Sequence, residues 1–247
     1  MSRERKVSRA FVTLADTLAE DFDPLSLFQR LVDHCTALLD VAAAGVMMRD
    51  ARGGLRTAAA SSEEAAFLEV LQLQHGSGPC VDSYYQRRRL SVPNLSAERA
   101  RWPLVVPAAI DAGFSAMHTV PLRLHEHVVG AVNLFRTERG ALSPEDQCLA
   151  QDLSDATMLA LMQWSAEPAR PGEILTRLQS VIAAKSNLEI AKGMIVEHGG
   201  VTFADAAHML RAYAEGHHVK LIDTVRALVN HELAPSAIVG SLDSQAQ

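Results

Sequence analysis

The chain has 247 residues, of which 48% are hydrophobic and 5% aromatic, and its formal net charge is −6. This composition is that of an ordinary globular protein with one or two domains. It contains no uncharged apolar run of about eighteen residues and no signal-peptide pattern, so we expect a cytoplasmic protein without a membrane span. The mild acidity argues against a nucleic-acid binder that depends on overall charge, so any such function requires a local site.

Residues 7–166 combine helical patterns with paired strand patterns. Helical spacing predicts helices over residues 7–20, 25–40, 63–74 and 144–165. The last of these has Ser143 as its N-cap and Pro144 at its first position. Apolar runs on either side of a polar turn predict two hairpins, over residues 41–62 and 115–136. Hairpins flanked by helices indicate an α+β domain with an antiparallel sheet, which we place at residues 7–166.

A linker and a helical region follow. Pro168, Pro171 and Gly172 interrupt the helical pattern, so residues 167–173 are predicted to be a linker. Residues 174–234 show three helical patterns and no strand, and the second helix opens with a capping-box pattern at Thr202 and Asp205. The tail, residues 235–247, is small and polar, and we expect it to be disordered.

The first helix of this region carries a heptad-like apolar stripe in which two positions are lysine. The apolar positions are Ile174, Leu178, Val181, Leu188 and Ile195, and the lysines are Lys185 and Lys192. Three short helices make a small core, so we expect two chains to pair through this stripe as a homodimer. Lys192 is either a lysine that extends along a partly exposed helix to solvent, or one of two charges presented with Lys185 to a phosphate.

The stretch "LEIAKGMIVEHGG", residues 188–200, also places Gly193 inside this helix. A glycine in a helix interior costs about 0.5–1 kcal/mol relative to alanine. Its benefit is room for the close approach of another backbone, so we expect Gly193 to lie against a second helix.

The C-terminal sequence "IAKGMIVEHGGVTFADAAHMLRAYAEGHHVKLIDTVRALV", residues 190–229, resembles the ANTAR domain of bacterial transcription antiterminators. The shared features are Ala-Lys-Gly at 191–193, a glycine turn, and a capped helix that ends "LRAYA". The resemblance implies an all-α three-helix bundle that binds paired RNA hairpins, usually as a dimer. It differs at Lys185, where relatives often have arginine, and at "GHHVK", which replaces an asparagine-containing turn.

The residues that match the ANTAR pattern are Ala191, Lys192, Gly193, Ala206, Leu210, Arg211 and Ala214. Lys185, Lys220 and Arg226 are further candidates for phosphate contacts, and Tyr213 and His217 for stacking on unpaired bases. Residues 173–232 contain six Lys or Arg against seven Asp or Glu, so we expect RNA binding to depend on few contacts.

A second resemblance rests on three segments: "QHGSGPCVDSYYQRRRLSVPNL", "RWP" at 101–103 and "VVGAVNLF" at 128–135. They resemble the GAF domain that precedes ANTAR in many such proteins. The resemblance covers residues 20–165. It implies either a small-molecule pocket between the sheet and the segments Gly76–Arg89 and Arg101–Phe114, or a dimerisation role. It names no ligand or cofactor.

Three cysteines, Cys35, Cys80 and Cys148, are widely spaced. Cys80 lies in a glycine-rich loop before a predicted helix, and a helix N-terminus lowers a thiol's pKa. Cys80 therefore has three alternative roles. It is a buried structural thiol, which is the favoured role, or a redox sensor or ligand-pocket residue, or a catalytic thiol like that of the GAF enzymes that reduce free methionine sulfoxide. Cys35 and Cys148 fall on apolar helix faces and are expected to be buried.

No residues show the spacing of a metal site, a catalytic triad or a nucleotide-binding loop, so we expect neither a metal nor catalytic residues, and no enzyme activity. The sequence therefore predicts a GAF sensor joined to an RNA-binding ANTAR bundle. The alternative is a protein-interaction or dimerisation module, with a redox- or ligand-sensing GAF domain and no RNA binding.

Overall fold

A computed structural model describes residues 2–16, 24–50, 54–163 and 187–243. The chain divides into two compact units, Met1–Gln179 and Ser180–Gln247. The predicted linker at 167–173, and the part of the predicted stripe from Ile174 to Lys185, lie outside the described residues. Within the described ranges, no helix is both long and apolar enough to cross a membrane.

The first unit is built on a five-stranded sheet in the order β2-β1-β5-β4-β3, with every neighbouring pair antiparallel. The strands are β1 Ala43–Arg49, β2 Leu55–Ala60, β3 Leu90–Val92, β4 Ala116–Leu124 and β5 His127–Arg136. Both predicted hairpins are confirmed, β1 with β2 and β4 with β5. The short edge strand β3 was not predicted from the sequence, because three residues are too few to show an alternating pattern.

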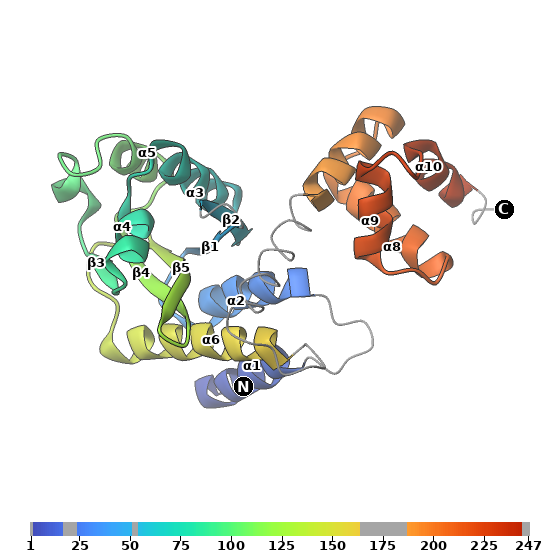
Figure 1. The fold of residues 1–247 in the computed structure, drawn as a ribbon. Helices are drawn as coiled ribbons and strands as arrows, with labels where there is room; N and C mark the ends of the chain where they lie inside the picture. The colour runs from blue at the N-terminus through green and yellow to red at the C-terminus, as the bar shows by residue number, and fades with distance from the viewer. Residues whose placement is uncertain (1, 17–23, 51–53, 164–186, 244–247) are drawn as a thin grey trace. The chain divides into compact units, whose positions relative to one another are not determined.

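Helices cover both faces of this sheet (Figure 1). One face is covered by α2 Pro24–Leu38 and α6 Pro144–Gln163, and α1 Arg3–Ala15 packs against these two helices. The other is covered by α3 Glu63–His75, α4 Pro79–Gln86 and α5 Val105–Asp111, with the short 3₁₀ helix Leu95–Glu98. The central strands β1 and β5 are therefore almost wholly buried, because each face of the sheet packs against helices. This is the predicted α+β architecture.

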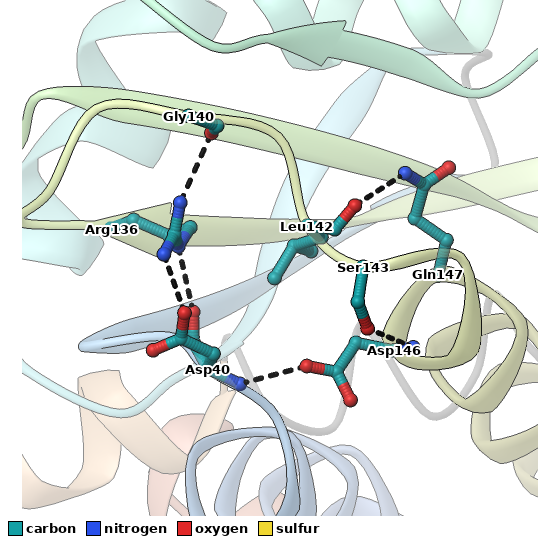
Figure 2. Close-up of polar contacts among 7 residues, drawn as sticks. All are labelled: Asp40, Arg136, Gly140, Leu142, Ser143, Asp146 and Gln147. Carbon is teal, nitrogen blue, oxygen red and sulfur yellow. Dashed lines mark hydrogen bonds and ion pairs between the residues drawn. The ribbon is translucent and has the colours of Figure 1, made fainter.

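A buried arginine joins α2, β5 and the loop that leads into α6 (Figure 2). Arg136, at the end of β5, donates from Nε to the carbonyl of Asp40 at 2.9 Å and from Nη1 to the carbonyl of Gly140 at 3.1 Å. Its Nη2 also pairs with the Asp40 carboxylate. Ser143 caps α6 as predicted, since its Oγ accepts from the backbone N–H of Asp146 at 3.0 Å.

The second unit is a bundle of short helices around one apolar core. The described helices cover residues 187–199, α8 Phe203–Gly216, α9 Leu221–Val229 and α10 Pro235–Asp243. The capping box predicted at Thr202 and Asp205 is present. The buried core residues are Ala191, Ile195, Ala206, Met209, Leu210, Val225, Leu228 and Ile238.

One prediction about this unit is wrong. The described part of residues 174–234 forms three helices, as expected, but residues 235–243 of the expected disordered tail form a fourth. The reason is the pair Ile238 and Val239, since Ile238 is completely buried in the core and Val239 packs against it. A tail with one buried apolar residue gains enough from packing to become a fourth helix.

Candidate functional site

Lys192, the central residue of the predicted RNA site, is already engaged within the helical unit. Its ammonium group lies 2.7 Å from a carboxylate oxygen of Glu189, and its side chain is only 16% exposed. The same nitrogen lies 5.9 Å from the ring centroid of Phe203, at the limit of a cation–π contact. A phosphate would therefore compete with Glu189 for this charge.

Gly193 does not permit close packing, which contradicts the prediction. A Cβ added at Gly193 would meet no atom of the described residues within 4 Å, apart from its own helix. The helix packs instead through Ala191 and Ile195, both completely buried. Against the described part of the chain, Gly193 therefore costs helix stability without allowing a close contact.

The other predicted RNA-binding residues lie on α8, on α9 and in the turn between them. Arg211 on α8 and Lys220, the N-cap residue of α9, are exposed, and neither forms an ion pair among the described residues. Arg226 is exposed but pairs with Asp223 at 2.9 Å. Lys185 lies outside the described residues. Of the predicted cations that the structure describes, Arg211 and Lys220 can therefore bind a phosphate without giving up an ion pair.

Tyr213 and His217 are brought together by the helical spacing of four residues. Their ring centroids are 4.0 Å apart and the rings are inclined by 21°. The Nδ1 atom of His217 lies 2.9 Å from the Tyr213 carbonyl oxygen. Because each ring already stacks on the other, a base would have to stack on an outer face of this pair.

Phe203 on α8 is not among the candidate residues that the sequence predicts. It is 56% exposed, while Ala206 and Leu210 on the same helix are completely buried. Phe203 is the first residue of the helix, immediately after the Thr202 cap. An exposed aromatic ring beside the Lys192 ammonium is a surface on which an unpaired base can stack.

The first unit contains a group of buried polar residues between the sheet and helices α3 and α4. We call it the polar cluster, and it consists of Glu69, Gln72, Cys80, Thr119 and Asn133. None is more than 1% exposed. The Asn133 side-chain amide donates to Glu69 Oε1 at 2.5 Å, and the Cys80 backbone N–H donates to Gln72 Oε1 at 3.0 Å. Thr119 on β4 is the register partner of Asn133 on β5.

The pocket expected on this face of the sheet is occupied largely by apolar side chains. The segments Gly76–Arg89 and Arg101–Phe114 do cover the face, as predicted, and they contribute Cys80, Trp102, Val106 and Phe114 to a core that includes Phe135. The polar cluster lies inside this apolar surrounding. A separate hollow of about 280 Å³ is lined from α1 and α2 by Thr13, Asp16, Arg30, Asp33 and His34.

Cys80 is a buried thiol. It is the second residue of α4 and completely buried. Burial, and next the Glu69 carboxylate, raise the pKa of the Cys80 thiol well above its usual value, although an Asn133 hydrogen bond acts the other way. Desolvation therefore outweighs the helix N-terminus. Burial therefore favours the structural interpretation of Cys80 over redox sensing.

The remaining cysteines differ from each other. Burial raises the pKa of the Cys35 thiol to about 12. Cys148, predicted to be buried, is exposed, because the buried face of α6 is formed by Ala150, Leu153 and Leu161. Among the residues that the structure describes, no group of three or more His, Cys, Asp or Glu side chains is placed to hold a metal ion.

The five-stranded antiparallel sheet with helices on both faces makes the first unit an α+β domain. The sequence model of the GAF domain matches residues 23–162, more than half of the chain, and the chain therefore belongs to the GAF domain family. GAF domains are signal-sensing or dimerisation modules, and this describes the first unit.

Solved structures share this fold at low sequence identity. The GAF domain of an Acinetobacter phosphoenolpyruvate-protein phosphotransferase is 13% identical, with a TM-score of 0.50 over 74% of this chain and 95% of that chain. A further GAF domain structure is 12% identical, with a TM-score of 0.50 over 64% of this chain and 88% of that one. Comparison with curated proteins gave no match. These likenesses establish the fold alone.

Proposed function

We propose that the chain is a transcription antitermination regulator in which the GAF domain receives a signal and the C-terminal unit is an ANTAR domain that binds paired RNA hairpins as a homodimer. The observation that supports this most strongly is the placement of the residues matching the ANTAR pattern. Ala191 and Leu210 are both completely buried in one core. Of their chain neighbours, Arg211 is exposed and Lys192 is partly exposed on the same small bundle. The proposal assigns no catalytic step to the chain.

The charge of the unit limits how it can bind RNA. Residues 180–247 contain five Lys or Arg and seven Asp or Glu, a net charge of 5 − 7 = −2. The general attraction to phosphate is therefore unfavourable, and affinity has to come from a few local contacts. If about three cations per protomer contact phosphates, log K should fall with log salt at a slope of about −2 per protomer.

A second candidate function is a protein-interaction module, and it is favoured by a different observation. Four large apolar side chains of the unit are substantially exposed: Ile190, Phe203, Val219 and Ile222, at 51%, 56%, 47% and 40%. Exposed apolar residues on an acidic surface suit a protein partner better than RNA. The two functions make opposite predictions for RNA binding.

The test is binding of the full chain to an RNA with two adjacent hairpins, at several salt concentrations. We expect Arg211→Ala to weaken binding about tenfold, equivalent to about 1.4 kcal/mol. Arg99→Ala removes an exposed arginine of the GAF domain and is the matched charge control, which should change affinity less than twofold. An RNA of the same stems with scrambled loops tests whether the loops are read.

RNA binding that needs both the loops and Arg211 supports the regulator. Absence of binding at low salt, or equal binding to both RNAs in the wild-type and Arg211→Ala chains, contradicts it and favours the interaction module.

A further inference from the structure

We infer that the polar cluster is the binding site for a small ligand without negative charge that carries a hydrogen-bond acceptor next to a donor, as in a lactam, a primary amide or a urea. This inference deepens the sensing part of the proposed function, because it specifies what the GAF domain would detect. It does not depend on RNA binding, and its test contains no RNA.

Three polar atoms of the cluster have no hydrogen-bond partner among the described residues. They are Gln72 Nε2, Thr119 Oγ1 and Asn133 Oδ1. An unsatisfied buried group costs about 1–3 kcal/mol, so three would cost a large share of the about 5–15 kcal/mol that stabilises a typical domain. Buried polar groups in folded proteins are nearly always satisfied, and these three come from three different elements facing one region. A molecule that satisfies all three would remove this cost.

The two amides cannot satisfy themselves by rotation. Gln72 Oε1 accepts from the Cys80 backbone N–H, so a flipped Gln72 would point a donor at a donor. Asn133 Nδ2 donates to Glu69 Oε1, so a flipped Asn133 would point an acceptor at a carboxylate. The orientation of each amide is therefore fixed by a partner at its other end. Gln72 presents a donor and Asn133 an acceptor.

The polarity of the ligand follows from this arrangement. It needs an acceptor for Gln72 Nε2 and a donor for Asn133 Oδ1, and the Thr119 hydroxyl can serve either group. Thr119 and Asn133 are direct register partners on antiparallel strands, so their Cβ atoms lie about 4.5–5.5 Å apart. The buried Glu69 carboxylate disfavours an anion. The apolar surrounding that includes Trp102 and Phe114 suits a compact carbon skeleton.

Two glycines show that the backbone is shaped around the cluster. A Cβ at Gly45 would lie 2.3 Å from Glu69 Oε1, and a Cβ at Gly78 would lie 2.3 Å from Gln72 Oε1. Gly78 also has a φ of 146°, which other residues rarely adopt. Both glycines therefore make room for polar side chains that an ordinary apolar core would not contain.

The test uses 2-pyrrolidinone as the probe, a lactam with adjacent acceptor and donor, and cyclopentanone as the matched compound without the N–H. Each is titrated into the full ¹⁵N-labelled chain while the side-chain amide signals of Gln72 and Asn133 are followed. We expect saturable shifts of both signals with the lactam, and no saturable shifts with the ketone.

Thr119→Val keeps the shape of the side chain and removes its hydroxyl, and we expect it to weaken lactam binding at least fivefold. Thr157→Val is the matched control, because Thr157 is also completely buried but its hydroxyl donates to the Leu153 carbonyl at 2.8 Å, outside the cluster. It should leave lactam binding unchanged. Gln72→Met, which removes the donor, should abolish binding, and its backbone spectrum reports whether the variant folds.

Three results would overturn the inference. The lactam could leave both amide signals unchanged, bind wild type and Thr119→Val equally, or bind no better than the ketone. A crystal structure obtained with the lactam in the crystallisation solution, but with only water at the three atoms, would also overturn the inference. None of these results depends on whether the chain binds RNA, so failure here is distinguishable from failure of the proposed function.

Discussion

Arg136 on β5 binds Asp40 twice, through the backbone carbonyl and through the carboxylate (Figure 2). The two residues differ in exposure, since the Arg136 side chain is 10% exposed and that of Asp40 is 76% exposed. A carboxylate so exposed is well solvated and screened, and its ion pair contributes little. The hydrogen bonds that Arg136 donates to the carbonyl oxygens of Asp40 and Gly140 contribute more to stability than this ion pair, because they satisfy both carbonyls.

We therefore predict unequal effects for the two sides of this contact. Arg136→Met should lower the free energy of unfolding by about 2–3 kcal/mol, because two carbonyls lose a charged donor. Asp40→Asn should lower it by less than about 1 kcal/mol. Urea denaturation of the full chain measures both. Equal losses would show that the ion pair, and not the carbonyl contacts, stabilises the junction.

Thiol labelling distinguishes the three cysteines. Cys148 is exposed, whereas Cys35 and Cys80 are buried and burial raises the pKa of both thiols. A maleimide should therefore label one thiol of the native chain rapidly and the other two only after unfolding. The Cys148→Ser variant should show no rapid reaction. Rapid labelling of Cys80 in this variant would restore the redox interpretation.

The stability of the GAF domain should fall in mild acid because of His118. Burial, and next the nearby Arg136 charge, lower the pKa of His118 from 6.5 to about 4, although a Gly140 backbone contact acts the other way. Its Nδ1 lies 2.9 Å from Ser91 Oγ. The folded state holds the neutral ring, whereas the unfolded chain takes up a proton below pH 6.5. Stability is therefore present above pH 6.5 and is lost as the pH falls towards 4.

The variant His118→Asn isolates this effect, because it keeps a polar group near Ser91 but does not titrate. Across this pH window, wild type should lose up to roughly 3 kcal/mol more than the variant. Urea denaturation at pH 7, 6, 5 and about 4 measures the difference. Parallel pH profiles for the two proteins would show that His118 is not the group responsible.

The sequence predicted the elements whose signals are local. The two hairpins and the caps at Ser143 and Thr202 depend on neighbouring residues, and the structure confirms them. It missed β3 and α10, which depend on contacts with distant parts of the chain. Their few apolar residues do not form a pattern until a partner surface is known.

The polar cluster could not be predicted, because α3 reverses the usual relation between polarity and burial. Glu69 and Gln72 are completely buried, whereas Phe67 and Val70 on the same helix are 57% and 44% exposed. A periodicity analysis assigns the apolar pair to the core and the polar pair to solvent. The correct orientation depends on Asn133 and Gly45, which are brought to α3 only by the folded sheet.

Replacing Gly193 should stabilise the helical unit. In Gly193→Ala the added methyl group points into open space, and the substitution removes the cost of a glycine inside a helix. It should therefore add about 0.5–1 kcal/mol to the free energy of unfolding. Gly130→Ala is the contrasting variant, because its Cβ would lie 2.2 Å from the Met47 carbonyl oxygen. It should destabilise the GAF domain by about 1–3 kcal/mol. A Gly193→Ala chain that is more stable but binds RNA less well would show that RNA approaches the backbone there.

The contact between Lys192 and Glu189 gives the sharpest test of RNA binding. Glu189→Gln releases the Lys192 ammonium from a carboxylate 2.7 Å away, and such a pair three residues apart on a helix contributes only about 0.2–0.5 kcal/mol to stability. We expect RNA affinity to rise about two- to fivefold at low salt and less at high salt. In a Lys192→Ala background the same substitution should have no effect.

Glu232→Gln provides the control for net charge. Glu232 is exposed, and its substitution changes the charge of the unit by the same amount as Glu189→Gln, from −2 to −1. A general electrostatic effect would raise affinity equally in both variants, whereas a contact between Lys192 and phosphate would raise it only in Glu189→Gln. Equal increases, or no increase in either, would remove Lys192 from the RNA site and leave Arg211 and Lys220 as its cations.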